Sequence, residues 1–381
     1  MDFSLTDEQL LVKQSAAEFA NDVLAPAYEQ IEIENNIPDE IIAQMAECEF
    51  AGLAYPEEIG GVGADYFTFI LALEQVCRAS GAVGSVLANN NLAVNAINKF
   101  GTPEQKAKYL PDCLSLKKIS SFAFTEPSTG SDPKSIESTA KLDGDEWVLN
   151  GQKRFISLAN YEGPLVVFAT DDQSGSPSAF IVDKFCPGYS IDTGYHKVGL
   201  HGAMLNDIFL EDVRIPKENI LLGPGKGYAA LTANIAFGKL SVSTVALGRA
   251  QGAFEEAIKF AEGRTRRGIP ITTYPTLQYR IAEMSAFLEA ARTAVYRMAW
   301  IADNWTDYGE IARESAKTKL FVTRTCTQIC RDAMQVCGSY GACLENKVEG
   351  MMRDCNLLEL VEGVDDVQHV IVAHNMDLKF K

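Results

Sequence analysis

The hydrophobic pattern of this chain changes its period twice, and that change restricts the fold more than any single motif. Residues 1–118 carry apolar side chains at helical spacing. Residues 119–225 carry short runs in which apolar and polar side chains alternate, as in strands with one buried face. Residues 226–381 return to the helical period in long segments suited to a bundle. The pattern predicts two helical regions with a β domain between them.

Two local signals locate individual elements. Thr6 followed by Gln9 has the spacing of a capping box, which predicts a helix that starts directly after Thr6. Within EWVLNGQKRFIS, the pair Asn150-Gly151 has the composition of a two-residue hairpin turn. We therefore expect the chain to reverse direction at that pair.

The composition argues against several classes of protein. A chain of 381 residues with 47% hydrophobic content can fill more than one core, which predicts two or three domains. A formal net charge of -17 argues against nucleic acid or an anionic membrane as the main partner. The first ten residues lack the pattern of a signal peptide, and we expect no apolar run of the roughly 20 residues that span a bilayer.

Cysteine and histidine usage gives the expected compartment. The nine cysteines are an odd number without CxxC spacing, which favours free thiols and a cytoplasmic location. The four histidines form no HExxH or similar ligand pattern, so we expect no metal site.

The loop from Phe122 to Asp132, FAFTEPSTGSD, collects hydroxyl groups, a glycine and backbone N–H groups between a helix and the β region. Such a loop suits a phosphate or the edge of a flavin. The same composition is typical of an ordinary turn, so the loop alone leaves both interpretations open.

Six blocks in a fixed order extend this observation over nearly the whole chain: TEPSTGSD, WVLNGQKRFIS, EDVRIPKENILLGPGKGY, ALGRAQGA, QVCGSYG and RDCNLLELVEGVDDVQ. In this order they resemble the acyl-CoA dehydrogenase family. The resemblance implies an α+β multidomain fold with an N-terminal α-helical domain (1–118), a middle antiparallel β domain (119–225) and a C-terminal four-helix bundle (226–381). It also implies FAD held between the last two domains, in what is usually a homotetramer.

The resemblance assigns cofactor contacts to several regions. Phe124, Thr125, Gly130 and Ser131 would face the flavin or its phosphates, and Phe155 and Ser157 would flank the ring. Arg264, Gln335 and Gly338 would reach the FAD of a neighbouring subunit. A guanidinium fits a pyrophosphate bidentately. Without the flanking match, residues 264–267 also fit a solvated charge run at a helix end.

Glu362 matches the family position whose carboxylate removes the α proton of a CoA thioester. The developing enolate oxygen would be stabilised by the backbone N–H of the same glutamate and a ribityl hydroxyl of FAD. Gly363 would supply the bend that lets the carboxylate project into a cleft and would lie in the substrate site. The alternative is that Glu362 and Asp365 only open the following helix, where acidic residues are favoured.

Several positions depart from the family pattern. Phe155 stands where tryptophan is common, and Ala236 and Lys239 stand where an aspartate and an arginine near the CoA are common, so we expect altered CoA contacts at Lys239. Residues 89–91 are three asparagines in the stretch that lines the acyl pocket in the family. We expect Asn91 to point into this pocket, where a buried amide needs a polar partner. This favours a short or alicyclic acyl group over a long alkyl tail, with a solvated helix face as the alternative.

The resulting functional hypothesis is FAD-dependent oxidation of an acyl-CoA to the 2,3-enoyl-CoA, with electrons passed to an electron-transferring flavoprotein. Two alternatives stay open. The same site could run in the direction of enoyl-CoA reduction, or the chain could be a divergent flavin-binding protein without dehydrogenase activity.

Overall fold

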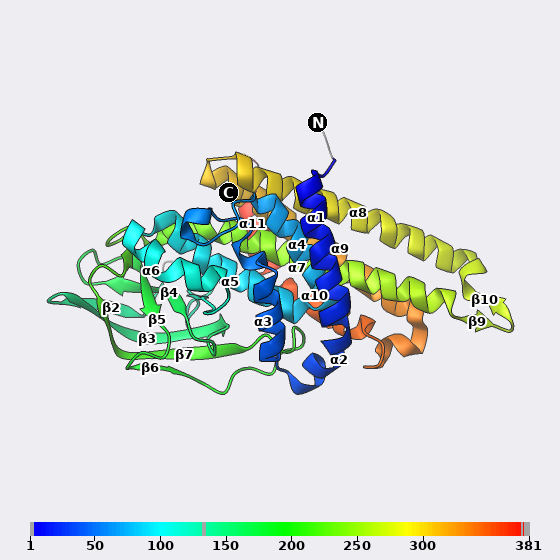
Figure 1. Cartoon of the computed structure of the whole chain (residues 1–381), viewed down its shortest axis with the longest axis horizontal. Helices are drawn as coiled ribbons and strands as arrows, with labels where there is room; N and C mark the ends of the chain where they lie inside the picture. The colour runs from blue at the N-terminus through cyan, green and yellow to red at the C-terminus, as the bar shows by residue number, and fades with distance from the viewer. Residues whose placement is uncertain (1–3, 132–134, 375, 377–381) are drawn as a thin grey trace.

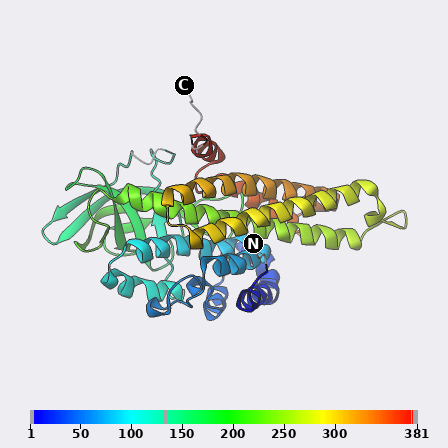
Figure 2. The ribbon, with the colours of Figure 1, turned by 90° about the horizontal axis from the view of Figure 1, so that it is seen from above.

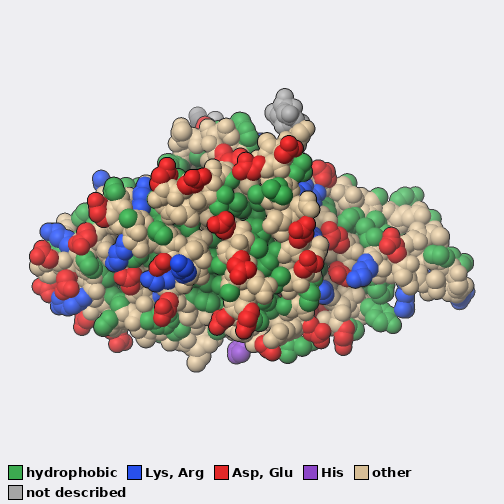
Figure 3. All heavy atoms as spheres, viewed as in Figure 1, with side chains coloured by type: hydrophobic (Ala, Val, Ile, Leu, Met, Phe, Trp, Pro, Cys, Tyr) green, Lys and Arg blue, Asp and Glu red, His purple; other side chains and the backbone are tan. Residues whose placement is uncertain are grey.

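The structure is a computed structural model that describes residues 4–131, 135–374 and 376. Figure 1 shows a β-sheet at one end of an elongated molecule, long helices that extend to the other end, and shorter helices packed beside them. In the view from above, the long helices form one layer and the N-terminal helices a second layer against it (Figure 2). Acidic side chains are scattered over the face in Figure 3.

The N-terminal region is helical as predicted. Its helices are α1 (Asp7–Phe19), η1 (Ala20–Leu24, a π-helical turn), α2 (Ala25–Glu34), α3 (Asp39–Glu47), η2 (Phe50–Gly52), η3 (Glu57–Ile59), α4 (Tyr66–Ala79), α5 (Gly81–Phe100) and α6 (Pro103–Leu114). Thr6 caps α1 in the expected capping box with Gln9. Helices α4 and α5 are buried over most of their length because their small and apolar residues continue around the whole helix.

The middle region forms one sheet with the strand order β6-β7-β3-β2-β4-β5-β8, and β1 pairs with β4. Its strands are β1 (Ser121–Ala123), β2 (Thr139–Asp143), β3 (Glu146–Ser157), β4 (Pro164–Asp171), β5 (Pro177–Asp183), β6 (Tyr189–Ile191), β7 (Leu205–Pro216) and β8 (Ile220–Leu221). Most neighbours are antiparallel, while β1 and β2 each pair with β4 in parallel.

The expectation of a turn at Asn150-Gly151 is wrong. Strand β3 runs straight through this pair, and its register against β7 shifts between Leu149 and Gly151. Asn150 and Gly151 therefore form a β-bulge, in which Gly151 has a φ of 152°. Bulges, like hairpin turns, favour glycine. The β2–β3 hairpin turns instead at Gly144-Asp145, between the paired residues Asp143 and Glu146.

The C-terminal region contains α7 (Gly227–Glu262), β9 (Thr265–Arg266), β10 (Ile269–Pro270), η4 (Ile271–Thr273), α8 (Pro275–Asn304), α9 (Tyr308–Cys337), η5 (Gly338–Ala342), α10 (Val348–Leu358) and α11 (Asp365–His374). Helix α7 packs against α8, α9 and α10 of this bundle and against α4 and α5 of the N-terminal region. The predicted fold class is confirmed, and α7 is the element that joins its two helical parts.

Helix α7 also departs from one expectation. Contrary to the expectation that no such run exists, it is long and apolar enough to cross a membrane by length and composition. However, 83% of its most apolar 18-residue window is buried inside the protein, as is usual for the central helix of a core.

Candidate active site

The turn between α10 and α11 presents Glu362 in an uncommon backbone conformation. Glu362 has a φ of 52° and Gly363 a φ of 87°, so two successive residues lie in the left-handed region. Lys319 of α9 donates from Nζ to the carbonyl oxygens of Glu359 (2.7 Å) and Gly363 (3.1 Å). Gln368 of α11 donates from Nε2 to the carbonyls of Glu362 (3.1 Å) and Gly363 (2.9 Å). Two buried side chains therefore hold the turn that carries the candidate base.

The carboxylate of Glu362 lies against the backbone of α7. Its Oε2 is 2.5 Å from the place where a Cβ on Gly238 would stand, and Leu92 Cδ1 of α5 is 3.3 Å from the same place. Any side chain at position 238 would thus displace the carboxylate. The missing side chain creates the space that Glu362 occupies.

Burial sets the protonation behaviour of this carboxylate. Glu362 is partly buried, and this burial raises the pKa of its carboxylate to about 7 despite the opposing charges of Lys239 and Lys319. A base works best when its pKa lies near the working pH. This arrangement fits a group that exchanges protons at neutral pH better than a residue that only opens a helix.

Lys239, predicted to contact the CoA ester, lies in the buried part of α7 directly after Gly238. It is 3% exposed, and no described residue forms a hydrogen bond or ion pair with its ammonium. Burial lowers its pKa to about 8, although the charge of Glu362 works against this shift. The neighbouring departure, Ala236, is also buried.

Phe155, predicted to flank a flavin ring, projects from a second bulge in β3. The register against β7 shifts between Lys153 and Ile156, and Phe155 takes a φ of 59°. Its side chain is 52% exposed and rests on the ring of Tyr195, with 4.9 Å between the ring centroids. Bulges commonly re-aim a side chain next to a functional site.

Asp207 of β7 fixes this bulge. Its carboxylate accepts hydrogen bonds from Gln152 Nε2 (2.9 Å), Arg154 Nε (3.1 Å) and the Tyr195 hydroxyl (2.8 Å). The predicted residue Ser157 ends the same strand and is partly buried.

The loop after β1 is built around a buried ion pair. Lys153 Nζ lies 2.6 Å from Glu126 Oε1, and both side chains are almost fully buried. Glu126 also accepts from the backbone N–H groups of Glu137 (2.6 Å) and Ser138 (3.0 Å). The charge of Lys153 and these N–H groups overcome the effect of burial and hold the pKa of Glu126 below its ordinary value.

The predicted flavin-facing residues of this loop lie next to β3. The N–H of Arg154 donates to the carbonyl of Thr125 (2.8 Å), and Phe124 packs edge-on against Phe168. Neither the N–H nor the hydroxyl of Thr125 has a hydrogen-bonding partner among the described residues. Gly130 and Ser131 are exposed, whereas Asp132 lies outside the described residues.

The remaining predicted cofactor contacts lie elsewhere. Arg264 stacks on the ring of Tyr340, with its Cζ 4.9 Å from the ring centroid, and Gln335 and Gly338 are exposed near the end of α9. Figures 1 and 2 both place β9, directly after Arg264, at the end of the molecule opposite the sheet. Within one chain the structure therefore does not bring Arg264 together with Phe155.

The amide of Asn91 is buried, and protein groups satisfy it. Its Nδ2 donates to the Tyr66 hydroxyl (2.7 Å), its Oδ1 accepts from the Tyr55 hydroxyl, and Tyr66 lies 3.4 Å from Ser241 Oγ of α7. The amide thus needs no polar acyl group as a partner. The argument that Asn91 favours such a substrate loses its basis, because tyrosines distant in sequence supply the hydrogen bonds.

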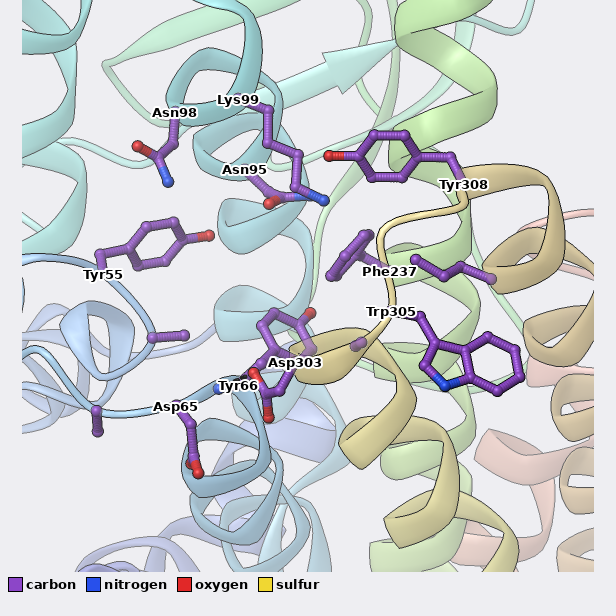
Figure 4. Close-up of a pocket in the computed structure, with 14 residues that line it drawn as sticks. Tyr55, Asp65, Tyr66, Asn95, Asn98, Lys99, Phe237, Asp303, Trp305 and Tyr308 are labelled. Atoms are coloured by element: carbon purple, nitrogen blue, oxygen red, sulfur yellow. Dashed lines mark hydrogen bonds between the residues drawn. The ribbon is translucent and has the colours of Figure 1, made fainter.

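A cavity of about 240 Å³ lies between the C-terminal part of α5, the start of α4 and the link from α8 to α9. Figure 4 shows Lys99, Phe237 and Tyr308 around it, and the Lys99 ammonium is 3.4 Å from the centroid of the Phe237 ring. Phe237 borders this cavity, while the next residue, Gly238, borders the carboxylate of Glu362. Asp303 lines it too, but its two oxygens accept the N–H groups that start α4.

Three residues of the site escaped the sequence analysis: Gly238, Lys319 and Gln368. Of these three residues, only Gly238 could have been singled out from the sequence. A glycine inside a helix costs about 1 kcal/mol relative to alanine, so its presence in the middle of α7 indicates a packing constraint. Lys319 and Gln368 look like ordinary polar helix residues until the turn that they hold is seen.

Comparison with family models covers almost the whole chain. Residues 6–117 match the acyl-CoA dehydrogenase N-terminal domain, residues 121–213 the middle domain and residues 225–376 the C-terminal domain.

Individual relatives include both dehydrogenases and reductases. The chain is 35% identical to the caffeyl-CoA reductase-Etf complex subunit CarC of Acetobacterium woodii, covering 97% of this chain and 98% of that protein. It is 35% identical to the 3-(aryl)acrylate reductase of Clostridium sporogenes, covering 97% and 99%. Among solved structures, butyryl-CoA dehydrogenase from Megasphaera elsdenii superposes with a TM-score of 0.94 at 28% identity, covering 99% of this chain and 100% of that chain.

Proposed function

The chain belongs to the acyl-CoA dehydrogenase family of oxidoreductases, and from this premise we propose that it interconverts an acyl-CoA and its 2,3-enoyl-CoA with Glu362 as the proton-transferring group. The observation that carries this proposal is the Glu362 carboxylate itself. It lies against Gly238, is held by a turn with two left-handed residues, and has a pKa of about 7 because of burial.

The residues of the middle domain fit FAD as the cofactor. An exposed aromatic ring at Phe155 offers a flat surface for the isoalloxazine ring, and the N–H and hydroxyl of Thr125, which have no partner among the described residues, would bind its polar edge. When bound, FAD supplies the acceptor for the β hydrogen, which leaves as a hydride. We propose that Phe124, Gly130, Ser131 and Ser157 line the same FAD-binding surface.

The chain's own residues would manage the proton. In the oxidative direction the Glu362 carboxylate takes the proton from the α carbon, and in the reductive direction the carboxylic acid returns it. No described residue accepts a hydrogen bond from the backbone N–H of Glu362, so this N–H is available to the thioester oxygen as negative charge develops there. Gly363, with its positive φ, lets the chain turn away directly after this N–H.

An electron-transferring flavoprotein is the proposed redox partner. CarC is a subunit of a caffeyl-CoA reductase-Etf complex, and a chain from the structure of the electron transferring flavoprotein of Acidaminococcus fermentans superposes with a TM-score of 0.95 at 34% identity. The two reductase relatives specifically favour enoyl-CoA reduction as the second candidate for the physiological direction. A short or alicyclic acyl group stays our proposal for the substrate, and its support is now the similarity to butyryl-CoA dehydrogenase and no longer the amide of Asn91.

A homotetramer is the proposed assembly. Arg264, Gln335 and Gly338 lie near the end of the bundle away from the sheet, so they reach a cofactor bound beside Phe155 only if it belongs to another subunit. The separation within one chain supports this proposal.

The substitution Glu362→Gln tests the proton-transfer role. We expect the variant to retain FAD and to bind a CoA ester. The rate of flavin reduction by butyryl-CoA should fall about 100-fold to 10,000-fold or more, because the amide cannot accept the α proton. Stopped-flow absorbance under anaerobic conditions measures this rate. Flavin reduction at the wild-type rate in E362Q would show that another residue is the base.

A further inference from the structure

Lys184 is a buried lysine whose hydrogen-bond acceptors carry no charge. It follows β5 directly and is 6% exposed. Its Nζ donates to the carbonyl oxygens of Ile119 (2.8 Å) and Leu158 (2.8 Å) and to Ser121 Oγ (2.9 Å). These three acceptors match the three N–H groups of an ammonium. An apolar side chain would avoid the cost of burying this charge, so what the lysine adds is a fixed arrangement of its acceptors.

The acceptors belong to two segments that carry predicted flavin contacts, residues 119–125 around β1 and residues 154–158 at the end of β3. The segments also meet at a second point, because the N–H of Arg154 donates to the carbonyl of Thr125 (2.8 Å). Lys184 thus joins one end of this pair of segments, and the bond from Arg154 joins the other end. Between the two joints lie three residues proposed to line FAD: Phe124, Phe155 and Ser157.

The chain around Lys184 is closely packed. The backbone N–H of Lys184 donates to the carbonyl of Gly163 (3.0 Å). A Cβ on Gly163 would lie 2.5 Å from the carbonyl oxygen of Ile119, so only glycine lets the two chain segments approach this closely. Leu158 has a φ of 61°, a conformation that leucine avoids unless its surroundings impose it. The hydrogen bond from Lys184 to the carbonyl of Leu158 is one such constraint.

We propose that Lys184 is a positioning residue for FAD binding, which joins residues 119–125 to residues 154–158 and so preorganises the surface that the flavin meets. The inference rests on the proposed function, because it assumes that FAD binds beside Phe155 and Thr125. A surface held in its bound arrangement loses less conformational freedom on binding, so its affinity is higher. Without the ammonium the segments lose one of their two joints, and FAD binding must then order them.

The test compares how tightly variant holoenzymes hold FAD. Holoenzyme saturated with added FAD is diluted and ultrafiltered, and the flavin absorbance of the retained and filtered fractions gives the Kd of FAD. We expect K184M to raise this Kd about 10-fold to 100-fold, as does the loss of a residue that orients the direct ligands of a metal. The visible circular dichroism of the bound flavin should also change, because its ring then rests on a differently arranged surface.

Two further variants make the result specific. S121A removes one of the three acceptors and should raise the Kd of FAD about 2-fold to 10-fold, the equivalent of one hydrogen bond. This milder variant decides the question if K184M does not fold. N219A is the control, since the buried amide of Asn219 donates to the carbonyl of Ile181 in β5 (3.0 Å) and to the hydroxyl of Tyr109 in α6 (2.9 Å). It should lower the free energy of unfolding in urea while both flavin readouts stay at their wild-type values.

The outcomes separate the inference from its premise. If K184M and S121A keep the wild-type Kd and circular dichroism, or if N219A raises the Kd as much as K184M does, Lys184 does not position the FAD surface and the inference is overturned. F155A tests the premise, since it removes the ring on which the flavin would lie. Wild-type flavin readouts in F155A would overturn the proposed FAD site and, with it, the inference.

Discussion

Glu362 and Phe155 share a backbone conformation that most side chains avoid. Their φ angles of 52° and 59° cost on the order of 1–2 kcal/mol each relative to ordinary conformations. In each case the surrounding hydrogen bonds hold the residue there: Lys319 and Gln368 around Glu362, and Asp207 beside Phe155. In both places the conformation directs a functional side chain out of its element.

The lack of a side chain at position 238 is the next residue-scale constraint. In G238A the new methyl group would meet Glu362 Oε2 at 2.5 Å, so we expect the carboxylate to move and kcat/KM for butyryl-CoA to fall about 10-fold to 100-fold. Alanine is the better helix former, so the free energy of unfolding should not fall by the amount typical of a core defect. Steady-state kinetics and thermal unfolding measure the two effects.

G263A is the matched control, because a Cβ at this end of the same helix would lie 3.6 Å from its nearest neighbour, the carbonyl oxygen of Lys259. It should retain wild-type kinetics. Equal kcat/KM values for G238A and wild type would show that the carboxylate does not need the space beside Gly238.

Glu362 should also link stability to pH. Its pKa is raised from 4.5 to about 7, so the folded state prefers the protonated form, and stability falls as pH rises from about 4.5 to 7. E362Q cannot ionise and escapes this loss. We therefore expect E362Q to gain stability over wild type across this range, by on the order of 1–3 kcal/mol at pH 8. Urea unfolding at pH 5 and pH 8 measures this gain, and a difference that does not change with pH would contradict the assigned burial.

At the scale of elements, the loop after β1 depends on the buried pair of Glu126 and Lys153. Removing one partner leaves an uncompensated buried charge, so K153M should destabilise the protein by about 3–5 kcal/mol and reduce its FAD content. The exposed pair of Arg214 and Glu146 provides the control, since E146Q should cost at most about 1 kcal/mol and retain FAD. Urea unfolding and flavin absorbance test both variants, and unchanged FAD content in a folded K153M would separate this loop from the cofactor.

The elements also show what the sequence could predict and what it could not. Periodicity identified the helical and β regions, because burial of one face imposes it locally, and the Thr6 cap was visible for the same reason. Asn150-Gly151 was misinterpreted because hairpin turns and bulges both favour glycine. The surroundings of Asn91 and Lys239 depend on residues far along the chain, namely Tyr55, Tyr66 and Glu362, so no local pattern could give them.

At the scale of the whole molecule, the predicted cofactor contacts are divided between two regions: β9, directly after Arg264, lies at the end of the bundle opposite the sheet that carries Phe155 (Figures 1 and 2). If FAD is shared between subunits, R264A should lose FAD and weaken the assembly together, whereas R266A, an exposed neighbour in β9, should not. Light scattering coupled to size-exclusion chromatography and flavin absorbance measure both properties. A wild-type protein that is monomeric with full FAD occupancy would contradict the shared site.

The most direct test of the central claim is an anaerobic absorbance titration of the purified holoenzyme with straight-chain, branched, alicyclic and aryl acyl-CoA esters. The reverse titration adds the matching enoyl-CoA esters to the dithionite-reduced protein. We predict that one class of ester bleaches the oxidised flavin band, that its enoyl partner restores the band, and that E362Q does neither. A flavin that no ester bleaches and no enoyl ester reoxidises would contradict the proposed interconversion.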